Sequence, residues 1–150
     1  MRRLTALGGI ASLLWLSATT AESPSNDDPT VALAHITSAF RDGQAQQLRA
    51  LTTPGSRVRV DVRNGRSTLG SYGPGQFEAV LGRLFSEHET LAFEFQADAT
   101  KVYGDTAFAR AAWVRRQRDQ SQSVTQMLTF GLWRENGAWR LAEIRSSPSP

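Results

Sequence analysis

Residues 91–146 read LAFEFQADATKVYGDTAFARAAWVRRQRDQSQSVTQMLTFGLWRENGAWRLAEIRS, and this stretch decides the fold class. Apolar and polar residues alternate from Phe93 until Gly104-Asp105, a dipeptide suited to a tight hairpin turn. In a second hairpin, Asn136-Gly137 supplies the positive φ angles of a type I′ turn, and Trp139–Ile144 forms the return strand. The stretch therefore predicts three or more consecutive antiparallel strands.

The chain before this stretch predicts helices and one more hairpin. Asp28 suits an N-cap and Pro29 the first helical position, and apolar residues then recur at helical spacing until Gly43 ends the helix. The other elements expected are a short helix over 44–51, a strand over 57–63, a short strand near 68–71 and a second amphipathic helix after Gly73. This order predicts a single α+β domain.

The N-terminus has the pattern of a secretory signal peptide. Arg2 and Arg3 precede an apolar run that continues to about Ala18, and small residues follow up to Ala21. We expect a signal peptide over 1–21, a flexible lead-in over 22–28, the folded domain over 29–146 and a disordered tail over 147–150. The prediction is an exported protein, periplasmic or extracellular. The alternative is that the segment stays uncleaved as a single membrane anchor.

Composition excludes several classes of site. The chain contains no cysteine, so it has no disulfide framework and no thiolate ligand or nucleophile. Arg2 and Arg3 belong to the signal segment, and without them 15 basic side chains stand against 14 acidic ones. Such a balance argues against nucleic-acid binding. We also expect no membrane span once the signal peptide is removed.

Two segments carry a resemblance to a known superfamily. The closing segment FGLWRENGAWRLAEIRS resembles the last hairpin of the nuclear transport factor 2-like superfamily. The segment GSYGPGQFEAVLGRLFSEH, followed by a Phe-x-Phe strand, resembles small exported bacterial members with no assigned function. The resemblance implies a curved antiparallel sheet wrapped around N-terminal helices, a cystatin-like cone. It is specific for the fold, because this cone hosts SnoaL-like cyclases, ketosteroid isomerases and noncatalytic binding modules alike.

The resemblance directs attention to polar residues on apolar strand faces. Enzymes of this kind use carboxylates in the desolvated mouth of the cone, where burial raises a carboxyl pKa toward neutrality. Glu143 is expected to share a face with Trp139 and Leu141, and Arg110 interrupts another apolar face. Tyr72 enters the second long helix and is the third candidate. The alternatives are a structural ion pair for Glu143, with Arg110 for example, and a half-buried packing role for Tyr72.

Other polar groups carry weaker predictions. Neither His35 nor His88 has a recognisable partner in the sequence, and no metal-ligand spacing is present, so we predict no metal and no cofactor. Asp61 is expected on a solvated strand face. The sequence also predicts a polar hairpin tip, with Arg134 nearby across the strand pair, that contains Arg115, Arg116, Arg118 and residues 119–123.

These observations favour a noncatalytic ligand-binding or protein-interaction module. Its partner would be a small apolar ligand or a second copy of the chain, because apolar residues such as Met127 and Trp133 fall on both faces of the last strands. One alternative is an acid–base enzyme of the isomerase, dehydratase or cyclase type, which an interior filled by its own aromatic side chains would argue against. Another is a structural accessory of an envelope complex.

Overall fold

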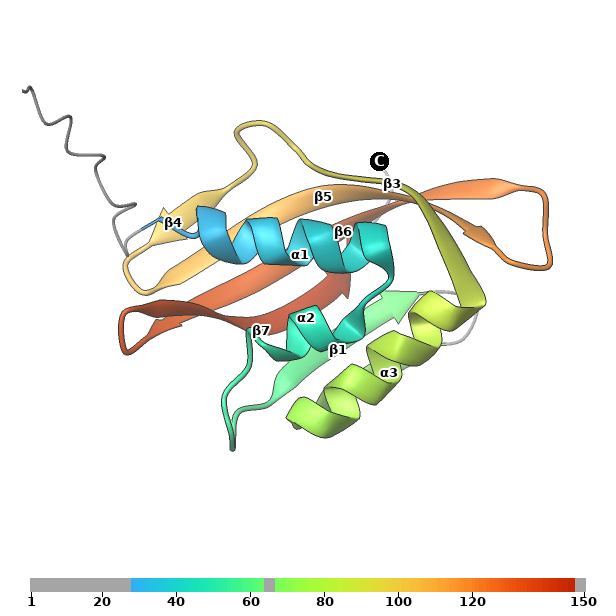
Figure 1. Ribbon diagram of the computed structural model, residues 1–150. Helices are drawn as coiled ribbons and strands as arrows, with labels where there is room; N and C mark the ends of the chain where they lie inside the picture. The colour runs from blue at the N-terminus through green and yellow to red at the C-terminus, as the bar shows by residue number, and fades with distance from the viewer. Residues whose placement is uncertain (1–27, 64–66, 148–150) are drawn as a thin grey trace, which may run out of the picture.

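In the computed structural model, which describes residues 28–63 and 67–147, the helices lie on one face of a curved sheet (Figure 1). We call the helix-covered side of the sheet its core face and the opposite side its outer face. The helices are α1 (Thr30–Asp42), α2 (Ala45–Arg49) and α3 (Pro74–Glu87). The predicted signal peptide, most of the lead-in and the end of the tail lie outside the described residues.

Helix α1 begins one residue later than the sequence predicts. Asp28 nevertheless stabilises the start of the helix. Its carboxylate accepts hydrogen bonds from the Thr30 backbone N–H at 2.9 Å and from the Thr30 hydroxyl at 2.5 Å. Gly43 ends the helix in the left-handed conformation with φ 64°, as predicted. The apolar stripe of α1 faces the sheet and is buried at Ala32, Ile36, Ala39 and Phe40.

The start of α1 gives a first testable prediction. The hydroxyl and backbone N–H of Thr30 hold the pKa of the Asp28 carboxyl below its ordinary value. A lowered folded-state pKa stabilises the fold above the unfolded pKa of about 3.9, and this contribution disappears as pH falls through the folded value. Asp28→Ala should therefore cost at most about 1 kcal/mol of unfolding free energy at neutral pH, since the site is exposed.

Urea unfolding at about pH 7 and about pH 2 checks this prediction. The difference between the wild type and Asp28→Ala should shrink at the acidic pH, whereas Asp119→Ala at a hairpin tip should behave like the wild type at both. If the wild type and Asp28→Ala differed equally in unfolding free energy at the two pH values, the charge on the Asp28 carboxylate would contribute nothing to stability.

Within the described residues, seven strands form one sheet in the order β2-β1-β7-β6-β5-β3, with β4 paired to β5. The fold-class prediction is confirmed, with one addition: β1 runs parallel to β7, so the sheet is mixed. Asn136 and Gly137 have φ angles of 50° and 76°, which confirms the expected type I′ turn. The strands are β1 (Val58–Arg63), β2 (Ser67–Tyr72), β3 (His88–Phe95), β4 (Lys101–Tyr103), β5 (Thr106–Gln117), β6 (Ser123–Glu135) and β7 (Ala138–Ser146).

Aromatic side chains fill the space between the helices and the core face. Phe40 of α1 lies at the centre, stacked on Phe93 at 4.5 Å and edge-on to Phe85, Trp113 and Phe130 at 5.1–5.6 Å between ring centroids. Four of these five rings are fully buried, and Phe85 is 4% exposed. The described interior is therefore a packed aromatic core rather than an open cone.

A β-bulge in β7 determines which side chains face this core. Gly131 pairs with Glu143, but the next residue of β6, Leu132, pairs with Leu141, so Ala142 is an extra residue in β7. Leu141 and Ile144 both lie on the core face as a result. The expectation that Glu143 shares a face with Trp139 and Leu141 is therefore wrong, because simple alternation fails across the bulge.

Candidate functional site

Glu143 lies on the outer face in contact with β1. Its carboxylate is 3.8 Å from the Arg59 guanidinium, and the side chains are 25% and 64% exposed. The carboxylate also folds over Gly131 of the neighbouring strand, where an added Cβ would lie 3.7 Å from Glu143 Oε2. Glu143 thus belongs to a structural ion pair, with Arg59 in place of the suggested Arg110.

Arg110 is exposed on the outer face of β5, opposite Thr129 of β6. Its side chain makes no hydrogen bond and no ion pair with any residue that the structure describes. Phe108, Ala112 and Val114 form the apolar face that Arg110 was expected to interrupt, and all three are half-buried. The face they share is the outer one, so Arg110 does not point into the interior.

Tyr72 ends β2 on the core face, where it packs against the edge of the hydrophobic core. Its ring lies over Gly70, because a Cβ added there would be only 2.5 Å from the ring. Tyr72 and Glu143 consequently lie on opposite faces of the sheet. The structure does not bring Glu143, Arg110 and Tyr72 together at one site.

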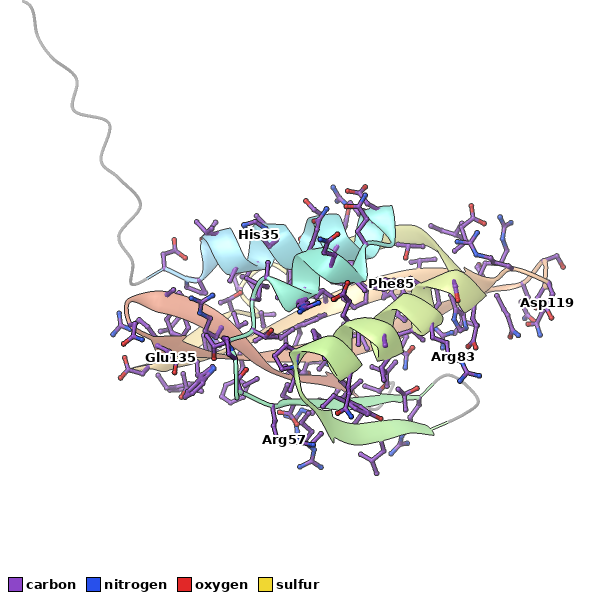
Figure 2. All side chains as sticks on the ribbon, turned by 60° about the horizontal axis from the view of Figure 1, so that its bottom comes forward. His35, Arg57, Arg83, Phe85, Asp119 and Glu135 are labelled. Carbon is purple, nitrogen blue, oxygen red and sulfur yellow. The ribbon has the colours of Figure 1, made fainter. Side chains whose placement is uncertain are left out.

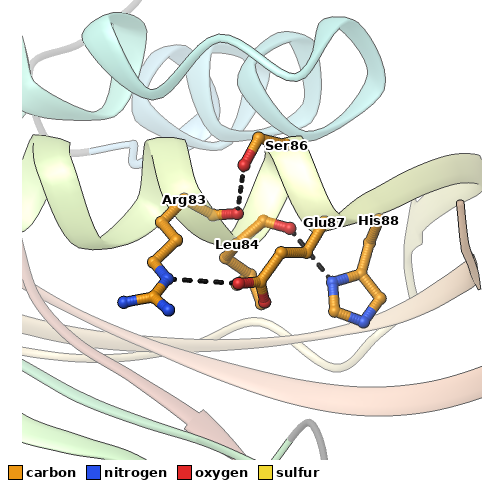
Figure 3. A network of polar contacts seen from close by, with 5 residues as sticks. All are labelled: Arg83, Leu84, Ser86, Glu87 and His88. Carbon is orange, nitrogen blue, oxygen red and sulfur yellow. Dashed lines mark hydrogen bonds and ion pairs between the residues drawn. The ribbon is translucent and has the colours of Figure 1, made fainter.

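The two histidines have different surroundings. His88 caps α3, is 5% exposed, and places Nδ1 3.0 Å from the Leu84 carbonyl oxygen (Figure 3). The same end of the helix holds the Arg83–Glu87 ion pair (Figure 3). His35 is exposed on α1 (Figure 2). Across residues 28–63 and 67–147, no three His, Asp or Glu side chains cluster in a way that would hold a metal ion.

The arginine run is not a hairpin tip, because β5 continues through Gln117 and Asp119 is at the turn (Figure 2). Arg115 lies on the core face, stacked 5.0 Å from the Trp113 ring, and burial lowers the pKa of its guanidinium. Arg116 pairs with Glu89 at 2.5 Å, and this hydrogen bond lowers the pKa of the Glu89 carboxyl. Arg134 is at the other end of the sheet, 2.8 Å from Asp105. The expected basic tip therefore does not exist as one surface.

The described interior holds no carboxylate. The buried polar residues are His88, Arg115 and Thr129, and every Asp and Glu that the structure describes has some exposure. Asp61, for example, is half-exposed on the outer face of β1. An acid–base site of the cone type needs a desolvated carboxyl group, and none of the described residues supplies one.

Replacing Glu143 tests the ion-pair assignment. Glu143→Gln should lower the unfolding free energy by less than about 1 kcal/mol, because Arg59 is mostly solvated and the pair is long. Denaturant unfolding at low and high salt measures this change. A loss well beyond this bound, insensitive to salt, would mean that Glu143 has a buried role that the contacts do not reveal.

Two surfaces could not be located from the sequence alone. One is the outer face of β5 and β6: Met127 and Trp133 were expected to offer apolar surface to a second copy, but the sequence did not show which side the described helices leave uncovered. The other is a pocket of about 300 Å³ between the first half of α1, residues 50–51 and the β6–β7 hairpin. The segments that line the pocket are far apart in the chain, so no local sequence pattern predicts it.

Comparison with known proteins identifies the family. The family model described as SnoaL-like domain matches residues 31–150. No curated protein matches the chain in sequence. Of the helices that the structure describes, none is long and apolar enough to cross a membrane.

Solved structures share the fold at low sequence identity. A DUF4783 family protein from Bacteroides ovatus is 16% identical with a TM-score of 0.60, over 78% of this chain and 94% of that one. A ketosteroid isomerase-like protein from Erwinia carotovora atroseptica is 18% identical with a TM-score of 0.61, over 86% and 99%. A putative calcium/calmodulin-dependent protein kinase type II association domain from Thiobacillus denitrificans is 15% identical with a TM-score of 0.61, over 85% and 100%. With this fold and the family match over residues 31–150, the chain belongs to the SnoaL-like domain family, within the nuclear transport factor 2-like fold.

Proposed function

We propose that this chain is an exported, noncatalytic protein-interaction module that pairs with a second copy of itself through the outer face of its sheet. One observation carries the proposal: none of the helices that the structure describes covers this face, yet it presents apolar side chains. Trp133 is 41% exposed there. The patch comprises Phe108, Ala112 and Val114 of β5 and Met127 and Trp133 of β6.

Strand register makes the patch suitable for a second copy. Ala112 pairs with Met127, and two residues along β5, Arg110 pairs with Thr129. Glu94, opposite Ala112, and Glu143 bring carboxylates to the same face. A two-fold symmetric interface brings the same patch of two subunits together. Because this face carries both an arginine and carboxylates, the arginine of one subunit can pair with a carboxylate of the other.

The fold relatives are consistent with an assembly role. The proteins from Thiobacillus denitrificans and Exiguobacterium sibiricum are described as association domains. They are 15% and 9% identical to this chain, so they share the fold, and their description supports the proposal only by analogy. The aromatic filling of the interior supports a noncatalytic role, because it leaves the acid–base alternative without a desolvated carboxylate.

Export rests on the sequence of the N-terminus. The charged start, the apolar run and the small residues up to Ala21 are typical of a signal peptide. Intact-mass measurement on protein recovered from the producing cell would show a chain that begins near Glu22. A mass that includes Met1 or residues 2–21 would instead support a retained anchor.

Sedimentation velocity of the purified protein over a range of concentrations tests the self-association. We expect a dimer that dissociates on dilution and is weakened only modestly by salt, since apolar side chains form most of the patch and exposed ion pairs contribute little. A monomer at every concentration would contradict the proposal.

A further inference from the structure

The pocket beside α1 presents chemistry that self-association does not use. The residues that line it come from the start of α1 (Asp28, Val31, Ala32 and His35), from residues 50–51, and from the β6–β7 hairpin (Gly137, Ala138, Trp139 and Arg140). A backbone hydrogen bond joins two of these segments, because the Leu141 N–H donates to the Leu51 carbonyl at 2.9 Å. A volume of about 300 Å³ suits a small molecule.

Two hydrogen-bond donors at this pocket lack acceptors. Trp139 is 7% exposed, and its indole N–H has no partner within the described ranges. The Arg140 Nε–H is likewise buried and unpartnered. Buried polar groups normally find a partner, so two adjacent exceptions indicate that something is missing from their surroundings.

The charge at the pocket favours an anion. Arg140 forms no ion pair among the described residues, and its one hydrogen bond, from Nη1 to the Ala50 carbonyl, is long at 3.4 Å. The first turn of α1 also lines the pocket, and the N-terminal end of a helix carries partial positive charge. Asp28 is the opposing group, but its carboxylate is engaged by Thr30.

We propose that this pocket binds a small organic acid, with its carboxylate at Arg140 and its apolar body against Val31, Leu51 and Trp139. The guanidinium makes the first contact. Trp139 and Arg140, the two residues with the unpartnered N–H groups, both line the pocket. Most of the lining comes from α1, residues 50–51 and the β6–β7 turn, away from the outer-face patch, although Arg140 itself pairs with Trp133 of that patch.

Indole N–H signals in ¹⁵N NMR spectra give a direct test, because Trp113, Trp133 and Trp139 report separately. The probes are butyrate, hexanoate, octanoate and phenylacetate, with hexanamide and phenylacetamide as neutral matches. At least one acid should move the Trp139 signal saturably while the signal of the fully buried Trp113, which does not line the pocket, stays in place. Its amide should bind at least about tenfold more weakly, because hydrogen bonds to charged groups are the stronger ones.

Variants of two arginines on β7 complete the test. Arg140→Gln should weaken binding of the acid by about tenfold or more, while Arg145→Gln on the exposed outer side should leave it unchanged. Arg140→Lys keeps the charge without the Nε–H, so its affinity should fall between the wild type and Arg140→Gln. The proposal is overturned if none of the acids moves the Trp139 signal, if acid and amide bind equally, or if folded Arg140→Gln binds as the wild type does.

Discussion

Phe40→Ala is expected to lower the unfolding free energy by about 3–5 kcal/mol, the range for deleting a fully buried phenylalanine. Phe40 is 0% exposed and contacts four aromatic rings from α3, β3, β5 and β6. No single helix or strand can close around the space that its loss would leave. Urea unfolding monitored by circular dichroism measures the change.

Ser38→Ala is the matched control on the same helix. Ser38 is exposed, so its replacement should change the unfolding free energy by less than about 0.5 kcal/mol. If Phe40→Ala cost less than about 1 kcal/mol, the aromatic side chains would not be closely packed. A loosely packed interior would then leave room for a catalytic site.

Met127→Glu is expected to abolish dimerisation while leaving the monomer folded. Met127 is half-buried on the outer face, beside Ala112 of β5. In a monomer the new carboxylate can reach water, but in a dimer it would be enclosed without a partner at a cost of several kcal/mol. The dissociation constant should therefore rise by more than about a hundredfold.

Val31→Glu is the matched control, since Val31 is 56% exposed on α1, on the opposite side of the sheet. Sedimentation equilibrium on both variants compares the two faces. Loss of the dimer in Val31→Glu but not in Met127→Glu would place the interface on the helices, contrary to the proposal.

Much of the fold could be predicted because its signals are local. Gly43 ends α1, Asn136-Gly137 forms its turn, and the alternation of Val58, Val60 and Val62 buries one face of β1, all within a few residues of the pattern concerned. The parallel pairing of β1 with β7 could not be predicted in this way. This pairing places Arg59 opposite Glu143, and the periodicity of apolar residues within a segment does not predict contacts between segments so far apart in the chain.

The candidate site was less predictable for a related reason. Assigning Glu143 to a face assumed unbroken alternation along β7, and the extra residue Ala142 reverses the assignment beyond it. We predicted Arg115 in a hairpin loop because a run of charged residues is typical of exposed turns. In the structure its long side chain packs over Trp113 on the core face. The pocket beside α1 depends on α1 meeting the β6–β7 hairpin.

Inter-subunit distances between spin labels test the central claim, that outer faces pair, most directly. The chain has no cysteine, so one introduced cysteine labels one position. We would compare Arg110→Cys on the outer face with Ser38→Cys on α1, using pulsed dipolar spectroscopy at dimer-forming concentration. The account predicts a defined distance between Arg110→Cys labels that is shorter than the one between Ser38→Cys labels. A shorter distance between the Ser38→Cys labels, or no dipolar coupling at either position, would contradict it.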